Sequence, residues 1–183
     1  MPRVLIPLAQ GCEELEAVTI IDLLRRAGIE VITASLDDQP VTASRGTVIV
    51  SDTDLETVKN DVFDMIVLPG GLPGADNLSS DPRIIDLLKR HAKEDKTLAA
   101  ICAAPKVLAH AGLLKDHKAT CYPGSLDALD LEEIQLSDAP IIIDGNIITS
   151  RGPGTAMDFA LTLVESLIDK DKRDEVEAAL CRA

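Results

Sequence analysis

The sequence has few aromatic residues: no Trp, one Tyr (Tyr122) and two Phe (Phe63 and Phe159) among 183 residues. Proteins that bind single-stranded nucleic acid stack the bases on aromatic side chains, and this chain has little to offer for that. Basic residues are outnumbered, with 18 Lys and Arg against 31 Asp and Glu. The resulting net charge of -13 would repel a phosphate backbone or an anionic membrane surface. We therefore expect neither a sequence-specific nucleic-acid partner nor a membrane partner.

Paired cysteines and zinc-type histidine spacings are also missing. The four cysteines form no CxxC pair, and none of the three histidines lies in an HExxH motif. We expect no disulfide framework, no metal and no organic cofactor. The sequence has no signal-type or membrane-length apolar run, so we expect a cytoplasmic location.

What the sequence does contain is a regular alternation of strand and helix signals. Apolar strand-like runs lie at 4–9, 30–36, 64–68 and 97–101, and helix-like periodicity at 15–28, 81–96 and 155–168. Thr155 and Asp158 are spaced as a capping box for the last of these helices. Residues 41–52 indicate a strand pair, and Asp144-Gly145-Asn146 indicates a tight hairpin turn. We predict one α/β domain over 1–183, with a mostly parallel sheet between helix layers and a small β-hairpin.

In such folds, ligands bind beyond the carboxyl ends of the strands. Three loops should meet at that edge of the sheet, namely 10–16, 69–74 and 102–105. Their convergence predicts the position of a functional site.

Cys102 stands at the corner where the strand ends and the next helix starts. One interpretation is a small hydrophobic residue packed in the core. The other is a reactive thiol on a strand-to-helix turn of the kind that presents nucleophiles, with a helix from Ala103 lowering its pKa. We favour the second interpretation.

None of the histidines follows a strand in a position to activate this thiol, so the acidic cluster Glu13, Glu14 and Glu16 supplies the alternative. A carboxyl group beside the sulfur in a dry site would keep its proton and serve as general acid and base. Backbone N–H groups of 68–71 and of Ala103 could stabilise an oxyanion.

Five segments carry a resemblance to a known family: GCEELEAV (11–18), ASRG (43–46), VLPGG (67–71), AAICAAP (99–105) and TSRGPGTAMDFAL (149–161). In order and spacing the chain resembles the ThiJ/PfpI superfamily, and most closely the branch of the Parkinsonism-associated protein deglycase and its bacterial YajL-like relatives.

The resemblance implies a flavodoxin-like sandwich, a homodimer and an oxidation-prone cysteine. It implies specific site residues: Cys102 as nucleophile, Glu16 as its acid/base partner, Gly71 and Ala103 as backbone donors, and Arg45, Tyr122 and Pro153 at the rim. Two positions depart from the wider family. Ala103 stands where peptidase-like members carry a histidine, which disfavours proteolysis, and Tyr122 replaces a histidine found in several members.

The expected function is therefore that of a cofactor-free, glutathione-independent glyoxalase or deglycase acting on methylglyoxal and early glycation adducts. The alternative is an oxidative-stress sensor or redox-regulated chaperone that works through oxidation of Cys102. Both functions need an activated thiol, and the sequence does not separate them.

Overall fold

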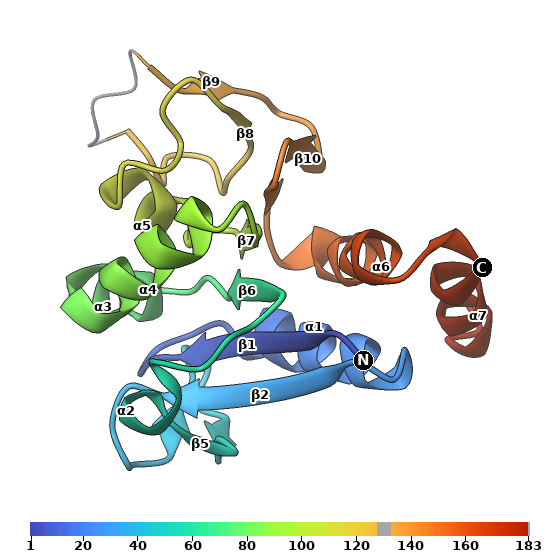
Figure 1. Ribbon diagram of the computed structural model, residues 1–183, viewed down its shortest axis with the longest axis horizontal. Coiled ribbons are helices and arrows are strands. Elements are labelled where there is room, and N and C mark those ends of the chain that lie inside the picture. Colours follow the sequence, from blue (N-terminus) through green and yellow to red (C-terminus); the bar gives the residue numbers. More distant parts are fainter. Residues whose placement is uncertain (128–132, 183) are drawn as a thin grey trace.

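The computed structural model describes residues 1–127 and 133–182. Its main sheet has seven strands in the order β10-β11-β7-β6-β1-β2-β5 (Figure 1). All neighbouring strands in it run parallel except β10 and β11. The strands are β1 (Arg3–Leu8), β2 (Glu30–Ser35), β5 (Thr53–Asp54), β6 (Met65–Leu68), β7 (Thr97–Ile101), β10 (Ile141–Asp144) and β11 (Ile147–Ser150).

Helices cover both faces of this sheet, which confirms the predicted sandwich (Figure 1). One face packs against α1 (Glu14–Arg26), α6 (Ala156–Leu167) and α7 (Lys170–Ala179). The other packs against α2 (Leu55–Val58), α3 (Gly74–Ser80), α4 (Pro82–Lys93) and α5 (Pro105–His110).

Successive side chains of the central strands enter alternate layers of the core. In β1, Val4, Ile6 and Leu8 belong to the layer under α1 and α6, whereas Leu5 belongs to the opposite layer. This follows from the two-residue period of a strand. It explains why the central strands are apolar throughout: both of their faces are buried.

The two predicted hairpins are present. β3 (Val41–Thr42) and β4 (Val48–Ile49) pair antiparallel in a small separate sheet. β10 and β11 pair antiparallel around a turn in which Gly145 has a φ of 60°. A further two-stranded sheet joins β8 (Lys118–Ala119) to β9 (Gln135–Leu136).

Two local predictions are wrong. The helix after Cys102 begins at Pro105 and not at Ala103, because residues 102–104 form a turn first. Thr155 does not cap α6 with its side chain. Its hydroxyl instead bonds to Ser150 and Gly152, within the 3-10 turn η1 (Pro153–Thr155) that precedes the helix.

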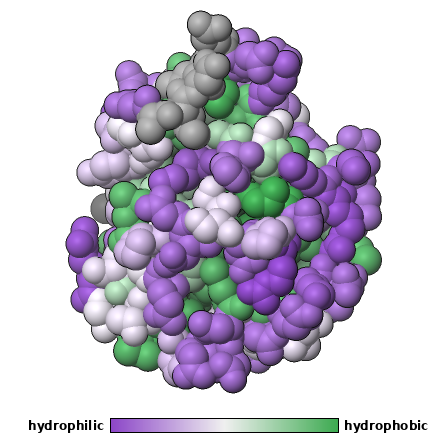
Figure 2. Space-filling view, turned by 90° about the vertical axis from the view of Figure 1, so that its left-hand side faces the viewer, coloured by the Kyte–Doolittle hydropathy of each residue, from purple (hydrophilic) through white to green (hydrophobic). Residues whose placement is uncertain are grey.

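Within 1–127 and 133–182, the structure has no helix of sufficient length and apolar character to span a bilayer. The side of the molecule nearest α3 and α4 is mostly hydrophilic, with hydrophobic residues in small scattered groups (Figure 2).

Candidate active site

Cys102 lies one residue beyond β7, in a backbone conformation that residues other than glycine rarely adopt. Its φ is 63°, in the left-handed region. Hydrogen bonds fix the turn on both sides, since Cys102 N donates to Ser150 O at 2.9 Å and Cys102 O accepts from Tyr122 N at 2.8 Å. The residue is 7% exposed. A strained residue held by its surroundings, with its sulfur at the strand-to-helix corner, is the arrangement of a nucleophile.

Glu16 lies on the first turns of α1 and is completely buried. Its Oε2 accepts a 2.8 Å hydrogen bond from Gly70 N, and the carboxyl group also interacts with the side chain of Cys102. No hydrogen-bond donor faces the buried Oε1 within the described residues. Burial raises the pKa of Glu16 to about 7, against the lowering effect of the contacts with Cys102 and Gly70. Glu16 can therefore exchange a proton near neutral pH.

The thiol of Cys102 does not have the low pKa predicted from the sequence. Burial and the adjacent charge of Glu16 raise its pKa to about 12, although the N–H groups of Gly71 and Ala103 lower it. The lowering of this pKa by the helix N-terminus is small, because α5 has only six residues and begins three positions after Cys102. The charge of Glu16 thus opposes ionisation of Cys102, and a single negative charge on the pair is favoured.

The two glycines after β6 bring the backbone against these groups. A Cβ on Gly70 would lie 2.7 Å from the Cβ of Cys102 and 2.8 Å from Oε2 of Glu16. Gly71 has a φ of 90°, and a Cβ there would lie 2.3 Å from Glu13 N. Sequence reasoning included Gly70 in a glycine turn but did not identify its position between the two reactive side chains.

The other two acidic residues of the cluster hold the loop before β4. Glu13 accepts a 2.8 Å hydrogen bond from Ser44 Oγ. Glu14 accepts bonds from the backbone N–H groups of Arg45 and Thr47, at 3.0 Å and 3.3 Å. These bonds, together with one from the Ser44 hydroxyl, lower the pKa of Glu14 to about 2, although burial acts to raise it. Glu14 is therefore a structural acceptor.

A cavity of about 340 Å³ opens above Cys102. It gathers six of the seven predicted site residues, and the seventh, Glu16, lies buried beneath Gly70. Of the other four lining residues, Glu13 and Leu72 lie in the loops 10–16 and 69–74 that were predicted to meet at the site, whereas Ser44 and Ser125 were not predicted as site residues. The full lining is Glu13, Ser44, Arg45, Gly71, Leu72, Cys102, Ala103, Tyr122, Ser125 and Pro153.

The other cysteines do not line this cavity. Cys12 is buried, and this burial, together with the nearby acidic residues, raises its pKa to about 11. Cys121 lines a different cavity, beside Pro123 and Leu126. Among 1–127 and 133–182, no three His, Cys, Asp or Glu side chains are grouped to hold a metal ion.

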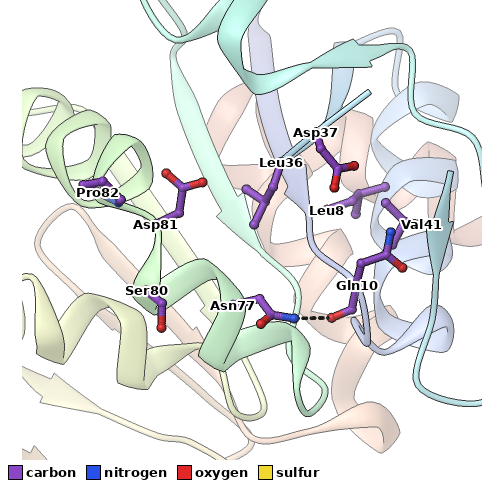
Figure 3. A pocket seen from close by; sticks show the side chains of 9 residues that line it. All are labelled: Leu8, Gln10, Leu36, Asp37, Val41, Asn77, Ser80, Asp81 and Pro82. Atoms are coloured by element: carbon purple, nitrogen blue, oxygen red, sulfur yellow. Dashed lines mark hydrogen bonds between the residues drawn. The ribbon is translucent and has the colours of Figure 1, made fainter. Parts of the chain in front are cut away.

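A larger cavity of about 410 Å³ lies beyond the carboxyl ends of β1 and β2, next to α3 (Figure 3). Asn77 crosses its floor and donates a 2.8 Å hydrogen bond to Gln10 O. The two carboxylates that line the cavity already have partners. Asp81 forms an ion pair with Arg83, and Asp37 accepts a hydrogen bond from Gln39 N. The described lining of this cavity contains no cysteine or histidine, and its one serine, Ser80, donates its hydroxyl to Asp76 O, so we assign the chemistry to the cavity above Cys102.

The model of the DJ-1/PfpI family matches residues 2–166. Protein dj-1beta of Drosophila melanogaster is 43% identical over 177 residues, covering 96% of this chain and 95% of that protein. Its crystal structure superposes with a TM-score of 0.95 at 42% identity, covering 100% of this chain and 98% of that chain.

Two further relatives bear on the comparison. Protein DJ-1 homolog A of Arabidopsis thaliana is 44% identical over 97% of this chain, which spans only 46% of that protein. A Caenorhabditis elegans protein named glutathione-independent glyoxalase DJR-1.2 is 37% identical, over 98% of this chain and 95% of that protein. A match along nearly the whole chain, together with a strained cysteine above a buried glutamate, identifies the chain as a member of the DJ-1/PfpI family.

Proposed function

We propose that this protein is a glutathione-independent glyoxalase that converts methylglyoxal to lactate, with Cys102 as nucleophile and Glu16 as general acid and base. The observation that carries the proposal is the pairing of the strained Cys102 with a buried carboxyl group whose pKa is raised to about 7. The naming of the C. elegans relative as a glyoxalase supports the same chemistry.

The shared charge of the pair explains how a thiol with a high pKa can react. When Glu16 is protonated, its repulsion of the thiolate disappears and its O–H can donate to the sulfur. The N–H groups of Gly71 and Ala103 already act on Cys102 and stabilise its negative charge. The reactive form is then thiolate and carboxylic acid, which carries the same total charge as thiol and carboxylate.

In the proposed reaction, the thiolate attacks the aldehyde carbon of methylglyoxal, and the new alkoxide takes the proton of Glu16. The Glu16 carboxylate then removes the hydrogen on that carbon as a proton and returns it to the neighbouring carbon, while the hydroxyl proton on the first carbon moves to the former ketone oxygen. This leaves a thioester of lactate on Cys102, and water cleaves the carbon–sulfur bond. One carbon is oxidised and its neighbour reduced, so the sum of methylglyoxal and water gives lactate without a cofactor.

Deglycase activity would use the same cysteine, because early adducts of methylglyoxal release or present the same carbonyl group. We propose it as an extension of the glyoxalase reaction, in the cytoplasm.

The second candidate is redox sensing or redox-regulated chaperoning through oxidation of Cys102. It is favoured by the donors around the sulfur, since the N–H groups of Gly71 and Ala103 could bind an oxygen added by a peroxide. A related structure, 39% identical with a TM-score of 0.94, is that of Toxoplasma gondii DJ-1, oxidized. Mass spectrometry after mild peroxide tests this candidate, which fails if Cys102 stays reduced while Cys181 is oxidised.

We also propose a homodimer. Exposed apolar side chains gather at the start of α1, where Leu15 and Val18 lie, and on the hairpin, where Val48 and Val50 lie. Glu14 ties these two elements together through its bonds to the 45–47 turn. Exposed apolar side chains on two linked elements are typical of an interface.

The test is lactate formation from methylglyoxal without glutathione, in the presence of a chelator. We expect Cys102→Ser to abolish turnover and Glu16→Gln to reduce kcat by about 10²- to 10⁴-fold, as is usual for loss of a general acid–base group. Cys121→Ser, in a different cavity, is the matched control and should keep activity. Turnover by Cys102→Ser equal to that of the wild type would refute the proposal.

A further inference from the structure

Tyr122 is the single tyrosine of the chain, and its place is fixed relative to the nucleophile. Its backbone N–H donates to Cys102 O at 2.8 Å. Its ring lies on the backbone of Gly152, where a Cβ would be only 3.3 Å from Cδ2 of the ring. The absence of a side chain at residue 152 is therefore what lets the ring lie so close to the backbone there.

Tyr122 is nevertheless 51% exposed, which leaves surface of this residue free to contact a ligand. Leu72, on the loop after β6, also lines the cavity and is 58% exposed. With Pro153 these residues are the apolar part of the lining, while Glu13, Ser44 and Arg45 belong to its polar part. Two large exposed hydrophobic side chains in one cavity, together with the reactive cysteine, indicate a ligand with an apolar part.

Methylglyoxal makes few contacts with the apolar part of the lining. It has a single methyl group beside its two carbonyl carbons, and a cavity of about 340 Å³ leaves most of the space unfilled. A planar aromatic group would contact the exposed part of the Tyr122 ring in an offset or edge-to-face arrangement.

We propose that Tyr122 is a specificity-determining residue, which makes the cavity favour 2-oxoaldehydes with an aromatic or similarly broad apolar group over methylglyoxal. The inference rests on the proposed glyoxalase function and names the substrate class of that same site. The ring acts by binding the non-reacting end of the substrate, so its contribution is to KM more than to kcat.

The experiment compares kcat/KM for phenylglyoxal and methylglyoxal in the wild type and in Tyr122→Ala. Aromatic contacts of this kind predict that Tyr122→Ala lowers kcat/KM for phenylglyoxal by about 3- to 10-fold, mainly through KM. The value for methylglyoxal should change by less than about 2-fold, because its methyl group makes few contacts with the ring. Tyr122→Phe should retain the preference, and Ile143→Ala, which removes an exposed apolar residue outside the cavity, should change neither value.

A second measurement separates this inference from the proposed function. Phenacyl chloride and chloroacetone both alkylate thiols, and the ratio of their rates at Cys102 is measured by mass spectrometry without any turnover. We expect Tyr122→Ala to lower the phenacyl-to-acetonyl ratio by the same 3- to 10-fold.

If neither aldehyde is turned over but this ratio falls, the cavity selects aromatic groups and the glyoxalase function is wrong. If both aldehydes are turned over and neither ratio differs between wild type and Tyr122→Ala, the glyoxalase function stands and the role of Tyr122 is refuted.

Discussion

At the scale of single residues, Gly70 is a position where the site leaves no room for a side chain. A methyl group there would be pressed against both the Cβ of Cys102, at 2.7 Å, and Oε2 of Glu16, at 2.8 Å. We expect Gly70→Ala to cost about 1 to 3 kcal/mol of unfolding free energy through overpacking. Because it also displaces the two reactive groups, it should lower kcat by about 10²-fold. Urea unfolding and lactate formation measure the two effects.

Gly154→Ala is the matched control for this change. A Cβ at Gly154 would meet nothing within 4 Å, so stability and turnover should both stay within error of the wild type. Full activity in Gly70→Ala would mean that Cys102 and Glu16 need not be so close, and would contradict the proposed mechanism.

Glu16 gives the stability of the protein a dependence on pH with a definite sign. Its folded pKa is raised from 4.5 to about 7, so the folded state binds this proton more tightly than the unfolded state does. Its contribution is fully present below pH 4.5 and is lost as the pH rises through 7. The loss is on the order of 3 kcal/mol for a buried carboxyl group shifted by this amount.

The difference in unfolding free energy between wild type and Glu16→Gln isolates this contribution from all other titrating groups. We expect the wild type to lose stability relative to the variant between pH 5 and 8. If the unfolding free energies of wild type and Glu16→Gln change with pH in the same way, the pKa of Glu16 is not raised by folding.

The sequence was sufficient to place Cys102 at a strand-to-helix turn, since a cysteine directly after an apolar strand and before a Pro-led helix has a recognisable environment. The choice of Glu16 for the acid/base role came from the resemblance, because three glutamates crowd the same helix start and the sequence does not show that Glu16 is the one that is completely buried. The pKa of Cys102 was predicted wrongly, because it depends on burial and on the charge of Glu16, and neither is visible in a linear sequence.

At the scale of secondary structure elements, the link between α1 and the β3–β4 hairpin depends on Glu14. Its carboxylate accepts the N–H groups of Arg45 and Thr47. We expect Glu14→Ala to raise hydrogen exchange at these two amides by about fivefold, since each such bond is worth about 1 kcal/mol. Because the pKa of Glu14 is lowered to about 2, the same amides in the wild type should stay protected until the pH falls through that value.

Glu14→Gln keeps one carbonyl acceptor and should increase the exchange less than Glu14→Ala does. Amides of the other hairpin, around Gly145, have no contact with Glu14 and should be unchanged in both variants. Equal exchange in wild type and Glu14→Ala would show that the hairpin is held by its own strand pairing.

The hairpins and the long helices could be predicted from local sequence signals, whereas the starts of α5 and α6 could not. The turn at Gly145 and the glycine stop of α1 are set by residues within a few positions. The start of α5 is instead delayed by the strained turn at Cys102, whose N–H and C=O bond to Ser150 and Tyr122, distant in sequence. Thr155 likewise turns toward Ser150 rather than capping its own helix.

At the scale of the whole molecule, the fold class was predictable because the strands are apolar on both faces. Val4, Ile6 and Leu8 face one layer while Leu5 faces the other, so the sheet had to lie between helices. The short edge strand β5 gave no comparable signal, since its two residues, Thr53 and Asp54, are polar. Its position beside β2 is fixed by pairing with Ala34 and Ser35.

The proposed dimer makes the last prediction, which depends on the exposed apolar residues of the hairpin and α1. Light scattering of the eluting protein should give twice the 19.5 kDa chain mass. The double substitution Val48→Asp and Val50→Asp places two carboxylates in an apolar interface, which is costly for an unpaired charge, so we expect a folded monomer. Ile143→Asp, at a residue as exposed but on β10, should remain dimeric. A wild type that elutes as a monomer at micromolar concentration would refute the dimer and leave the cavity residues of one chain to form the site alone.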